Sequence, residues 1–328
     1  ERINQFLPDA KVGKIQGQII DIENKDIVIG MLQSLSMKEY PENLFDDFGL
    51  TIIDEVHHIS AEVFCKALQN IVTMYNLGLS ATMSRKDGLT KVFKMFLGEV
   101  IHKEKNKTDD CILIKAICYK SNDEEFNQLE YDFKGYIKFT TMINKLCNHN
   151  CRSQLIVDVI INELKLNNNQ QIMILSVFKS LLVYIYKALQ HNNIINIGYY
   201  IGGMKQNELK ESESKQIILA TYGMASEGLD IKTLTTLIMA TPKKDIQQSI
   251  GRIMRQKHDN PLVIDIIDSH DIFKKQWYVR KNYYLKNNYK ILYTENYKND
   301  QWIEINKANK KNEDDENDIP KDICLISL

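Results

Sequence analysis

Short apolar runs alternate with helix-like stretches along most of this chain. The runs are rich in Ile, Leu and Val, which is typical of strands, and the stretches between them carry the spacing of amphipathic helices. This alternation indicates β-α-β units and therefore a parallel sheet. The predicted strands are Asp26–Ile29, Leu50–Asp54, Asn76–Leu79, Gln171–Leu175, Ile195–Tyr200, Ile217–Ala220, Thr236–Ala240 and Leu262–Ile267.

The predicted strands fall into two groups, which indicates an α/β fold of two parallel-sheet domains in tandem. The first domain is predicted over residues 1–105 and the second over residues 151–290. A chain of 328 residues is long enough for two ordinary cores. The opening stretch resembles the inside of a domain, with a helix over Arg2–Leu7 followed by a strand. We therefore expect a fragment of a longer product, with its first domain truncated at the N-terminus.

Two segments do not continue the alternation. Residues 106–150 are polar and charge-mixed around Ser121–Asp132, and we interpret them as a linker or inserted element. Residues 291–328 shift towards Asn, Lys, Asp and Glu and contain the charged run Lys310–Asp318. Such a composition is typical of a solvated, flexible tail.

The overall charge favours no particular partner. There are 42 Lys and Arg against 43 Asp and Glu, which gives a formal net charge of -1. Any contact with nucleic acid must therefore come from a local basic surface. The 6 cysteines lack framework spacing, and the chain has no N-terminal apolar signal region and no long apolar run. These features predict an intracellular, soluble protein that does not enter a membrane.

Two further patterns have ordinary explanations beside functional ones. Cys147, His149 and Cys151 could ligate zinc, but a second half of the site at suitable spacing is missing. A stripe of aromatic residues interleaved with Lys and Arg could stack on bases, but we favour a helix that packs its aromatic side. The stripe consists of Trp277, Tyr283, Tyr284 and Tyr289.

The first pattern with a specific chemistry is the acidic pair Asp54-Glu55, directly after an apolar strand. The carboxyl ends of parallel strands form the edge at which α/β folds bind ligands. There Asp54 could hold Mg²⁺ through water, and Glu55 could polarise a water that attacks a phosphate. An acid-rich helix N-terminus would explain the pair equally simply. The adjacent pair His57-His58 is too small a set for zinc.

Later blocks give the acidic pair its context. A second strand ends in Leu79-Ser80-Ala81-Thr82, so two hydroxyl groups are expected beside the carboxylates. Far downstream, Gln248, Arg252 and Arg255 have the spacing of one helix face. Guanidinium groups placed in this way suit the charge that builds up on a transferring phosphoryl group. A surface ion-pair helix would explain the arginines taken alone.

In this order the blocks resemble the motifs of the superfamily 2 nucleic-acid helicases. Asp54-Glu55-Val56-His57 resembles the DExH box, motif II, and Ser80-Ala81-Thr82 resembles motif III. Thr221 with Glu227, Gly228 and Asp230 resembles motif V, and the stretch from Gln248 to Arg255 resembles motif VI with its arginine fingers. The resemblance extends over most of the chain, from Glu1 to Tyr289.

Three further segments strengthen the resemblance. The stretch from Gly30 to Leu35 resembles motif Ib, which lies along the nucleic-acid backbone, and Tyr199–Lys205 resembles the segment between motifs IV and V. Arg85-Lys86-Asp87 is similar to the Arg-Glu-Asp element of the XPB-type DNA helicases, with Lys in place of Glu. Within the superfamily, the chain is most similar to helicases of nucleocytoplasmic large DNA viruses.

The resemblance implies two RecA-like domains with ATP and Mg²⁺ in the cleft between them. It implies a motor that moves along DNA, or RNA, in viral transcription or DNA metabolism, with the transcription machinery as a partner and the host cytoplasm or virion as its location. The implied catalytic residues are Glu55, Gln248, Arg252 and Arg255. The implied ATP contacts are Asp54, also the Mg²⁺ ligand, His57, Gly228 and Asp230. Ser80 and Thr82 are implied in coupling, and Gly30, Gln33, Ser34, Arg85 and Thr221 in nucleic-acid binding.

One expected motif is missing from residues 1–328. The family requires Gly-x-x-x-x-Gly-Lys-[Ser/Thr], whose amides and Lys hold the phosphates. Gly13-Lys14 is the early Gly-Lys pair, but Ile15 follows it and Pro8 stands where the first Gly should be. We expect the P-loop to lie upstream and the fragment alone to be inactive. The alternative is a non-hydrolysing nucleic-acid-binding remnant or one part of a split helicase.

Overall fold

The computed structural model describes residues 2–56, 61–80, 90–103, 112–226, 231–246, 249–251, 261–299 and 301–306. Contacts within the chain divide it into two units, Glu1–Glu104 and Lys105–Leu328, and we describe each separately. The division falls next to residue 105, where the sequence predicts the end of the first domain. No helix in the described ranges is both long and apolar enough to cross a membrane.

Unit 1 contains two small sheets rather than one. One has the strand order β2-β1-β3 and the other is the pair β4-β5. β1 pairs with β3 in parallel and β4 with β5 in parallel, whereas β1 and β2 form an antiparallel hairpin. The elements are α1 (Arg2–Phe6), β1 (Val12–Gln16), β2 (Ile19–Asp21), β3 (Ile27–Gly30), α2 (Leu32–Met37), β4 (Leu50–Ile53), α3 (Ala61–Asn70), β5 (Tyr75–Gly78) and α4 (Thr90–Leu97). Gly13 and Lys14 lie inside β1, so this pair is a strand and not a phosphate-binding loop.

Unit 2 is built on an eight-stranded sheet of order β13-β12-β6-β11-β10-β7-β9-β8. All its pairings are parallel except that of the edge strand β13. The strands are β6 (Leu113–Tyr119), β7 (Gln171–Ser176), β8 (Ile197–Tyr200), β9 (Ile217–Thr221), β10 (Leu234–Met239), β11 (Leu262–Asp268), β12 (Lys290–Thr294) and β13 (Ile303–Ile305). The helices are α5 (Glu124–Asn127), α6 (Phe139–Asn148), α7 (Asn150–Leu166), α8 (Lys179–His191), α9 (Gln206–Glu213), α10 (Tyr222–Ser226) and α12 (Asp271–Lys286), with a 3-10 turn at Tyr297–Asn299.

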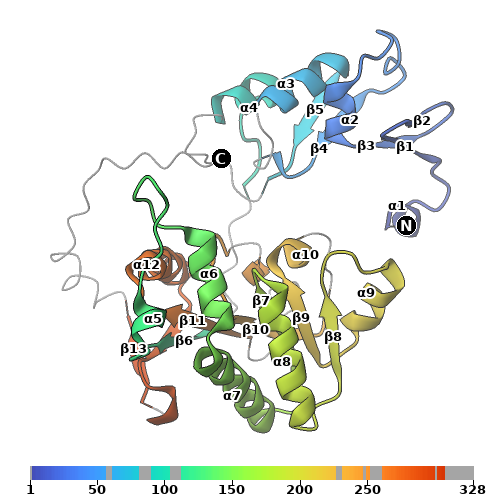
Figure 1. The fold of residues 1–328 in the computed structure, drawn as a ribbon. Coiled ribbons are helices and arrows are strands. Elements are labelled where there is room, and N and C mark those ends of the chain that lie inside the picture. The colour runs from blue at the N-terminus through green and yellow to red at the C-terminus, as the bar shows by residue number, and fades with distance from the viewer. Residues whose placement is uncertain are drawn as a thin grey trace. The chain divides into compact units, whose positions relative to one another are not determined.

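Helices cover both faces of this sheet (Figure 1). One face packs against α6, α7 and α8, and the other against α9, α10 and α12. The central strands read as continuous apolar runs because both faces are covered, and every residue of β7 and β11 is buried. The predicted α/β fold with a parallel sheet is therefore confirmed, and each predicted strand is present.

The structure corrects the interpretation of residues 106–150 as a linker or inserted element. β6, from Leu113 to Tyr119, lies between β11 and β12 inside the sheet of unit 2. Met142 and Leu146 of α6 are fully buried in its core. The strand is hard to identify because Lys115 interrupts its apolar run. In the fold the Lys115 ammonium group is 2.5 Å from a carboxylate oxygen of Glu163, and this ion pair allows the charge to lie in a half-buried position.

The start of the predicted flexible tail is also ordered. Residues 290–294 form β12 beside β6, and residues 303–305 form β13 at the sheet edge. The charged run Lys310–Asp318 lies outside the described residues. The interpretation of the aromatic stripe as a packed helix face is confirmed. Trp277 and Tyr284 lie on α12, and their side chains are buried in the core.

A buried ion pair fixes α12 to the sheet and yields a stability prediction. The Arg280 guanidinium group donates to both carboxylate oxygens of Asp265, at 2.7 and 2.9 Å, and also to the carbonyl oxygen of Lys243 at 2.9 Å. The Tyr284 hydroxyl donates to the same carboxylate at 3.0 Å. We expect Arg280→Met to lower the free energy of unfolding by roughly 3–5 kcal/mol, because it leaves a buried carboxylate without its cation.

Urea unfolding measures this change. The control is Lys66→Met, which breaks the exposed pair Lys66–Glu62 and should cost about 1 kcal/mol or less. An Arg280→Met protein as stable as this control would contradict the assignment.

Candidate functional site

The acidic pair of unit 1 lies where predicted, at the carboxyl edge of a parallel strand pair. β4 ends at Ile53, and Asp54 and Glu55 follow it with exposed side chains. The neighbouring strand β5 ends just before Leu79 and Ser80. The amide of Val56 donates to the carbonyl oxygen of Leu79 at 3.1 Å, and the amide of Leu79 donates to that of Ile53 at 2.8 Å. The structure therefore brings the carboxylates and the segment that carries Ser80 to one edge.

The backbone at Glu55 is unusual. Its φ angle is 50°, in the left-handed region that residues other than Gly and Asn seldom adopt. The Asp54 carboxylate accepts a hydrogen bond from the Glu55 amide at 2.9 Å and so supports this turn. Such a conformation costs on the order of 1–3 kcal/mol and is found most often at functional sites. The strained backbone at Glu55 therefore favours a functional role for this turn.

These carboxylates fit a magnesium nucleotide. Mg²⁺ keeps several waters and takes one or two carboxylates together with substrate phosphates, which two exposed acids at a strand end can provide. No cluster of three or more metal-ligating side chains exists among the described residues. The two exposed acids therefore suit a metal ion that also binds the phosphates of a nucleotide.

Other predicted residues of unit 1 have clear structural contacts. The Ser34 hydroxyl accepts a hydrogen bond from the amide of Gly17 at 2.9 Å. At Gly30, a Cβ atom would come within 2.6 Å of a methyl carbon of Leu35, so a larger residue there would require the Leu35 side chain to shift. Gln33 is exposed in the first turn of α2. His57, Thr82 and Arg85 lie outside the described residues.

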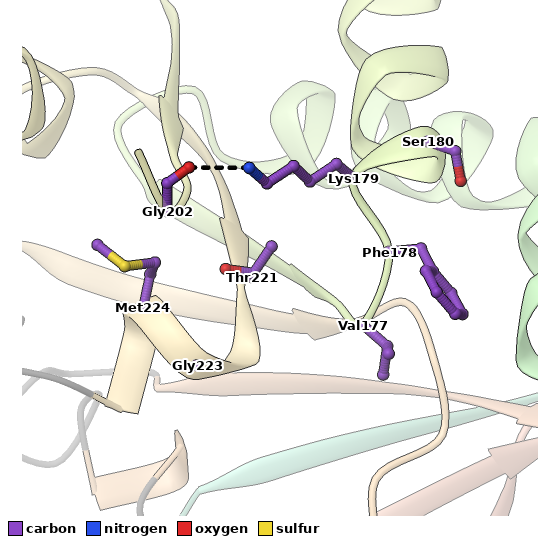
Figure 2. Close-up of a pocket in the computed structure, with 8 residues that line it drawn as sticks. All are labelled: Val177, Phe178, Lys179, Ser180, Gly202, Thr221, Gly223 and Met224. Atoms are coloured by element: carbon purple, nitrogen blue, oxygen red, sulfur yellow. Dashed lines mark hydrogen bonds between the residues drawn. The ribbon is translucent and has the colours of Figure 1, made fainter. Parts of the chain in front are cut away.

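Unit 2 carries a pocket of about 600 Å³ at the carboxyl ends of its strands (Figure 2). Figure 2 shows Lys179 reaching from the start of α8 towards Gly202, beside Thr221 at the end of β9. The Lys179 ammonium group donates to the carbonyl oxygen of Gly202 at 2.8 Å. The pocket is lined by Val177, Phe178, Lys179, Ser180, Gly202, Thr221, Gly223 and Met224.

This lining suits an anion. No side chain caps the start of α8 within the described part of the chain, so amides of its first turn remain available to a ligand. The N-terminus of a helix carries partial positive charge, and phosphate groups bind there. Lys179 adds a full charge, and Ser180 and Thr221 add hydroxyl donors. Gly202 and Gly223 carry no side chain that would keep a ligand backbone away.

A buried loop connects this pocket to the segment that leads to the arginines. Thr241 follows β10, and its hydroxyl accepts a hydrogen bond from the amide of Val177 at 2.9 Å. Its carbonyl oxygen accepts one from the Tyr222 hydroxyl at 2.8 Å. Arg280 donates to Lys243 in the same loop. The pocket and the chain that enters the Gln248–Arg255 segment are therefore connected through the hydrogen bonds of one loop.

The described part of unit 2 contains some of the site residues that the sequence predicts. Thr221 lines the pocket, and Ile250 of the motif VI-like block is buried in the core. Gly228, Asp230, Gln248, Arg252 and Arg255 lie outside the described residues. Sequence reasoning missed Lys179 and Ser180. The signal was present, because Ser176–Ser180 follows a predicted strand just as Asp54-Glu55 does.

The cysteine pair of the sequence lies in the second unit, with one member in the core. Cys147 is buried, and this burial raises the pKa of its thiol to about 11. His149 accepts a hydrogen bond from the amide of Arg152 at 3.4 Å and thereby caps the start of α7. The pattern is explained by packing and capping.

Comparison with known proteins gives two family matches. Residues 1–85 match the family described as the res subunit of type III restriction enzymes, and residues 155–257 match the helicase conserved C-terminal domain. A protein of Acanthamoeba polyphaga mimivirus, named as a candidate ATP-dependent RNA helicase, is 38% identical over 298 residues, which cover 89% of this chain and 57% of the relative. A similarly named protein of African swine fever virus is 30% identical and is matched over 83% of this chain and 57% of its own length. The chain thus spans little more than half of these relatives.

A solved structure shows the same fold. The yeast protein Dbp5, bound to RNA and ADP BeF3, superposes with a TM-score of 0.54 at 11% identity, over 87% of this chain and 70% of its own. The fold is therefore that of the RecA-like helicase ATPases. Together with the family matches, this means that the chain belongs to the superfamily 2 helicases and is related to those of nucleocytoplasmic large DNA viruses.

Proposed function

We propose that this chain is the motor portion of an ATP-dependent helicase or translocase that moves along a nucleic-acid strand. The observation that carries the proposal is the pocket of unit 2, where Lys179, Thr221 and the start of α8 converge. The whole molecule has a formal net charge of -1, so a polyanion must be held by a local site of this kind. Phosphate contacts supply most of the sequence-independent affinity for nucleic acids.

The acidic strand end supports the hydrolytic half of the proposal. Asp54 would hold Mg²⁺ through water, and the ion would supply positive charge beside the ATP phosphates. Glu55, fixed by its left-handed backbone, orients and polarises the attacking water. Arg252 and Arg255, with Gln248 on the same predicted helix face, stabilise the charge that develops on the transferred phosphoryl group.

Coupling between strand binding and hydrolysis follows from the shared loop. A strand in the pocket contacts Thr221, which directly precedes Tyr222, and Tyr222 is bonded to Thr241. Movement of this loop would change the approach of the segment that carries Arg252 and Arg255. Ser80 and Thr82 are proposed to relay the corresponding change in unit 1 from the carboxylates.

The proposal also concerns whether the nucleic acid is RNA or DNA, and the biological process that the motor serves. The names of the two viral relatives favour RNA, whereas the Arg85-Lys86-Asp87 element resembles that of DNA helicases. The viral relatives favour a role in viral transcription or DNA metabolism. Binding assays must therefore include single-stranded RNA and DNA of the same sequence.

The test of strand binding is fluorescence anisotropy with labelled oligonucleotides over a range of salt concentrations. We expect Lys179→Ala to weaken binding and to reduce the slope of log K against log salt by about 0.7, the value for one phosphate contact on a single strand. The matched control is Lys187→Ala, an exposed cation further along α8 that does not line the pocket. Equal slopes for the two variants would remove the pocket from the proposal.

A non-hydrolysing nucleic-acid-binding protein is the second candidate function. It is favoured by the pocket of unit 2, which can hold a phosphate chain without hydrolysis, and by the location of Gly13-Lys14 within a strand. The two candidates make the same prediction for strand binding. They differ in ATP turnover, which the variants of Arg255 and Glu55 address below.

A further inference from the structure

A short hairpin of unit 2 carries aromatic side chains that the fold leaves uncovered. We call residues 130–138, between α5 and α6, the aromatic hairpin; Tyr131 and Ile137 pair across it in an isolated antiparallel bridge. In Figure 1 it is the green loop that projects beyond the start of α6. Phe133 is 93% exposed and Tyr136 is 65% exposed. Tyr131 and the adjacent Phe139 are also exposed.

This exposure is concentrated in one place. Phe133 is the most exposed large hydrophobic side chain among the described residues, and these four are all the exposed large hydrophobic side chains from residue 112 to residue 165. Single exposed apolar residues are ordinary on a protein surface, whereas several gathered on one segment mark an interaction site. All four are aromatic and none is aliphatic, which favours a ligand with flat faces.

Hydrogen bonds hold the aromatic hairpin in one shape. The amide of Asp132 donates to the carbonyl oxygen of Tyr136 at 2.8 Å, and the amide of Gly135 donates to that of Asp132 at 3.0 Å. One oxygen of the Asp132 carboxylate accepts from the amides of Lys134 and Tyr136, at 2.8 and 2.9 Å. Gly135 has a φ of 80°, the left-handed conformation that a three-residue hairpin loop requires of its last residue. The rings therefore stand on a support that is formed before any ligand binds.

The base of the aromatic hairpin is fixed to the core of unit 2. Leu129 and Ile137 pack against the buried cluster to which α6, α7 and α8 contribute. The Phe139 ring is in edge contact with the buried Phe273 ring, with 5.7 Å between the ring centroids. The two most exposed rings, on Phe133 and Tyr136, are therefore the ones available to a ligand.

The charges around the rings favour an anion. Lys134 and Lys138 are exposed, and the Lys134 ammonium group lies 5.5 Å from the centroid of the Phe133 ring. The two acids of the hairpin are already engaged, since the Asp132 carboxylate accepts two amides of the turn and Glu130 forms a 3.3 Å ion pair with a lysine of α6. A ring with an ammonium group beside it offers a stacking face to a base and a positive charge to its phosphate.

We infer that the aromatic hairpin is a stacking site for the unpaired bases of a single nucleic-acid strand, with Phe133 and Tyr136 as the stacking rings. The inference rests on the proposed function, because it takes nucleic acid as the ligand, and it adds a second point of contact. The hairpin shares no residue with the pocket that contains Lys179, so the pocket binds phosphates and the hairpin binds bases. Every base has a flat face, so RNA and DNA strands should be bound alike at this site.

A protein partner is the other ligand that exposed apolar side chains can bind. Such a partner needs apolar area and not a ring in particular, so a leucine in place of Phe133 would serve it. A base needs the flat face of a ring, which leucine does not provide. The substitution Phe133→Leu therefore separates the two ligands.

The test is the binding of short single strands to the chain, measured by fluorescence anisotropy. One strand carries bases, and a second strand of the same length carries the same phosphates without bases. We expect Phe133→Ala to weaken binding of the first strand roughly 5- to 150-fold, the range for loss of one stacked base, and to leave binding of the second unchanged. Tyr136→Ala should behave in the same way. Phe133→Tyr keeps a ring and should retain binding, whereas Phe133→Leu should lose it.

A strand with a single 2-aminopurine in an otherwise base-free backbone reports stacking directly, because the fluorescence of this base falls when it stacks on an aromatic ring. The unsubstituted chain should quench the fluorescence on binding. The double variant Phe133→Ala/Tyr136→Ala should bind this strand through its phosphates with little quenching.

The matched control is Ile195→Ala. Ile195 is an 83% exposed apolar side chain of unit 2 that lies outside both the aromatic hairpin and the pocket. This variant should bind both strands like the unsubstituted chain. The hairpin variants replace side chains that are already more than half exposed, so their melting temperatures should stay unchanged, and if one fails to fold, the other still provides the test.

Three results would overturn the inference. The first is unchanged binding of the base-carrying strand by both Phe133→Ala and Tyr136→Ala. The second is a Phe133→Leu variant that binds this strand as well as the unsubstituted chain does, which would assign the hairpin to a protein partner. The third is an unsubstituted chain that binds the strands with and without bases equally.

These failures are distinguishable from failure of the proposed function. In each of the three cases, a reduced salt slope in Lys179→Ala would still support the phosphate pocket. A chain that binds no strand at all would contradict the proposed function and the stacking site together.

Discussion

Replacing Arg255 by Ala, in protein completed with the P-loop segment that superfamily 2 motors require, is expected to reduce nucleic-acid-stimulated ATP turnover roughly 10³–10⁵-fold. The same expectation applies to Arg252→Ala. An arginine that meets the transferred phosphoryl group stabilises the transition state, whereas an exposed ion pair contributes only about 1 kcal/mol or less. The two interpretations of these arginines therefore differ by orders of magnitude in rate.

Melting temperature and nucleic-acid affinity must be measured beside turnover. Both should stay near the unsubstituted values, because the proposed role concerns the transition state alone. Lys244→Ala is the matched control, since Lys244 is an exposed cation on the same approach to Gln248. If the arginine variants change stability and leave turnover intact, the residues belong to a surface ion-pair helix.

Glu55→Gln should lower turnover roughly 10²–10⁴-fold, the usual loss when a general base is removed. Nucleotide binding should be retained, because the amide has the same shape and Asp54 is unchanged. The left-handed backbone at Glu55 is kept in this variant, so the comparison isolates the carboxylate. Single-turnover hydrolysis and nucleotide binding, measured on the same preparation, separate the two effects.

Glu62→Gln provides the control for this substitution. Glu62 is an exposed acid in the first turn of α3, where the hydrogen bond from Lys66 lowers the pKa of its carboxyl group. It should turn over ATP like the unsubstituted protein. Undiminished turnover in Glu55→Gln would assign the acidic pair to a helix N-terminus.

Much of the fold was predictable, because buried parallel strands have a clear sequence signal. Gln171–Ser176 and Leu262–Asp268 are nearly continuous apolar runs, since helices cover both faces of their sheet. β6 was missed for a reason that is not local. Lys115 breaks its run, and the partner that makes this tolerable, Glu163, lies far away in the sequence. The pattern of apolar and polar residues in one sequence does not reveal the Lys115–Glu163 ion pair.

The candidate sites, like the fold, were predictable from the sequence only in part. Asp54 and Ser80 were predicted to meet, because each follows a strand and neighbouring parallel strands end at one edge. The anion-binding features of Lys179 depend on the helix start beside it and on Gly202, which β8 brings close. The loop at Thr241 could not be predicted at all, since its bonds to Val177 and Tyr222 arise only in the folded sheet.

The most direct test of the motor assignment is the rate of ATP hydrolysis with and without single-stranded nucleic acid, measured on the P-loop-completed protein and on its Glu55→Gln variant. The account predicts hydrolysis that rises when RNA or DNA is added, and loss of this stimulated rate in the variant. A completed protein that binds nucleic acid through the Lys179 pocket but hydrolyses ATP at the same slow rate with and without it would contradict the account and leave the non-hydrolysing binding protein in its place.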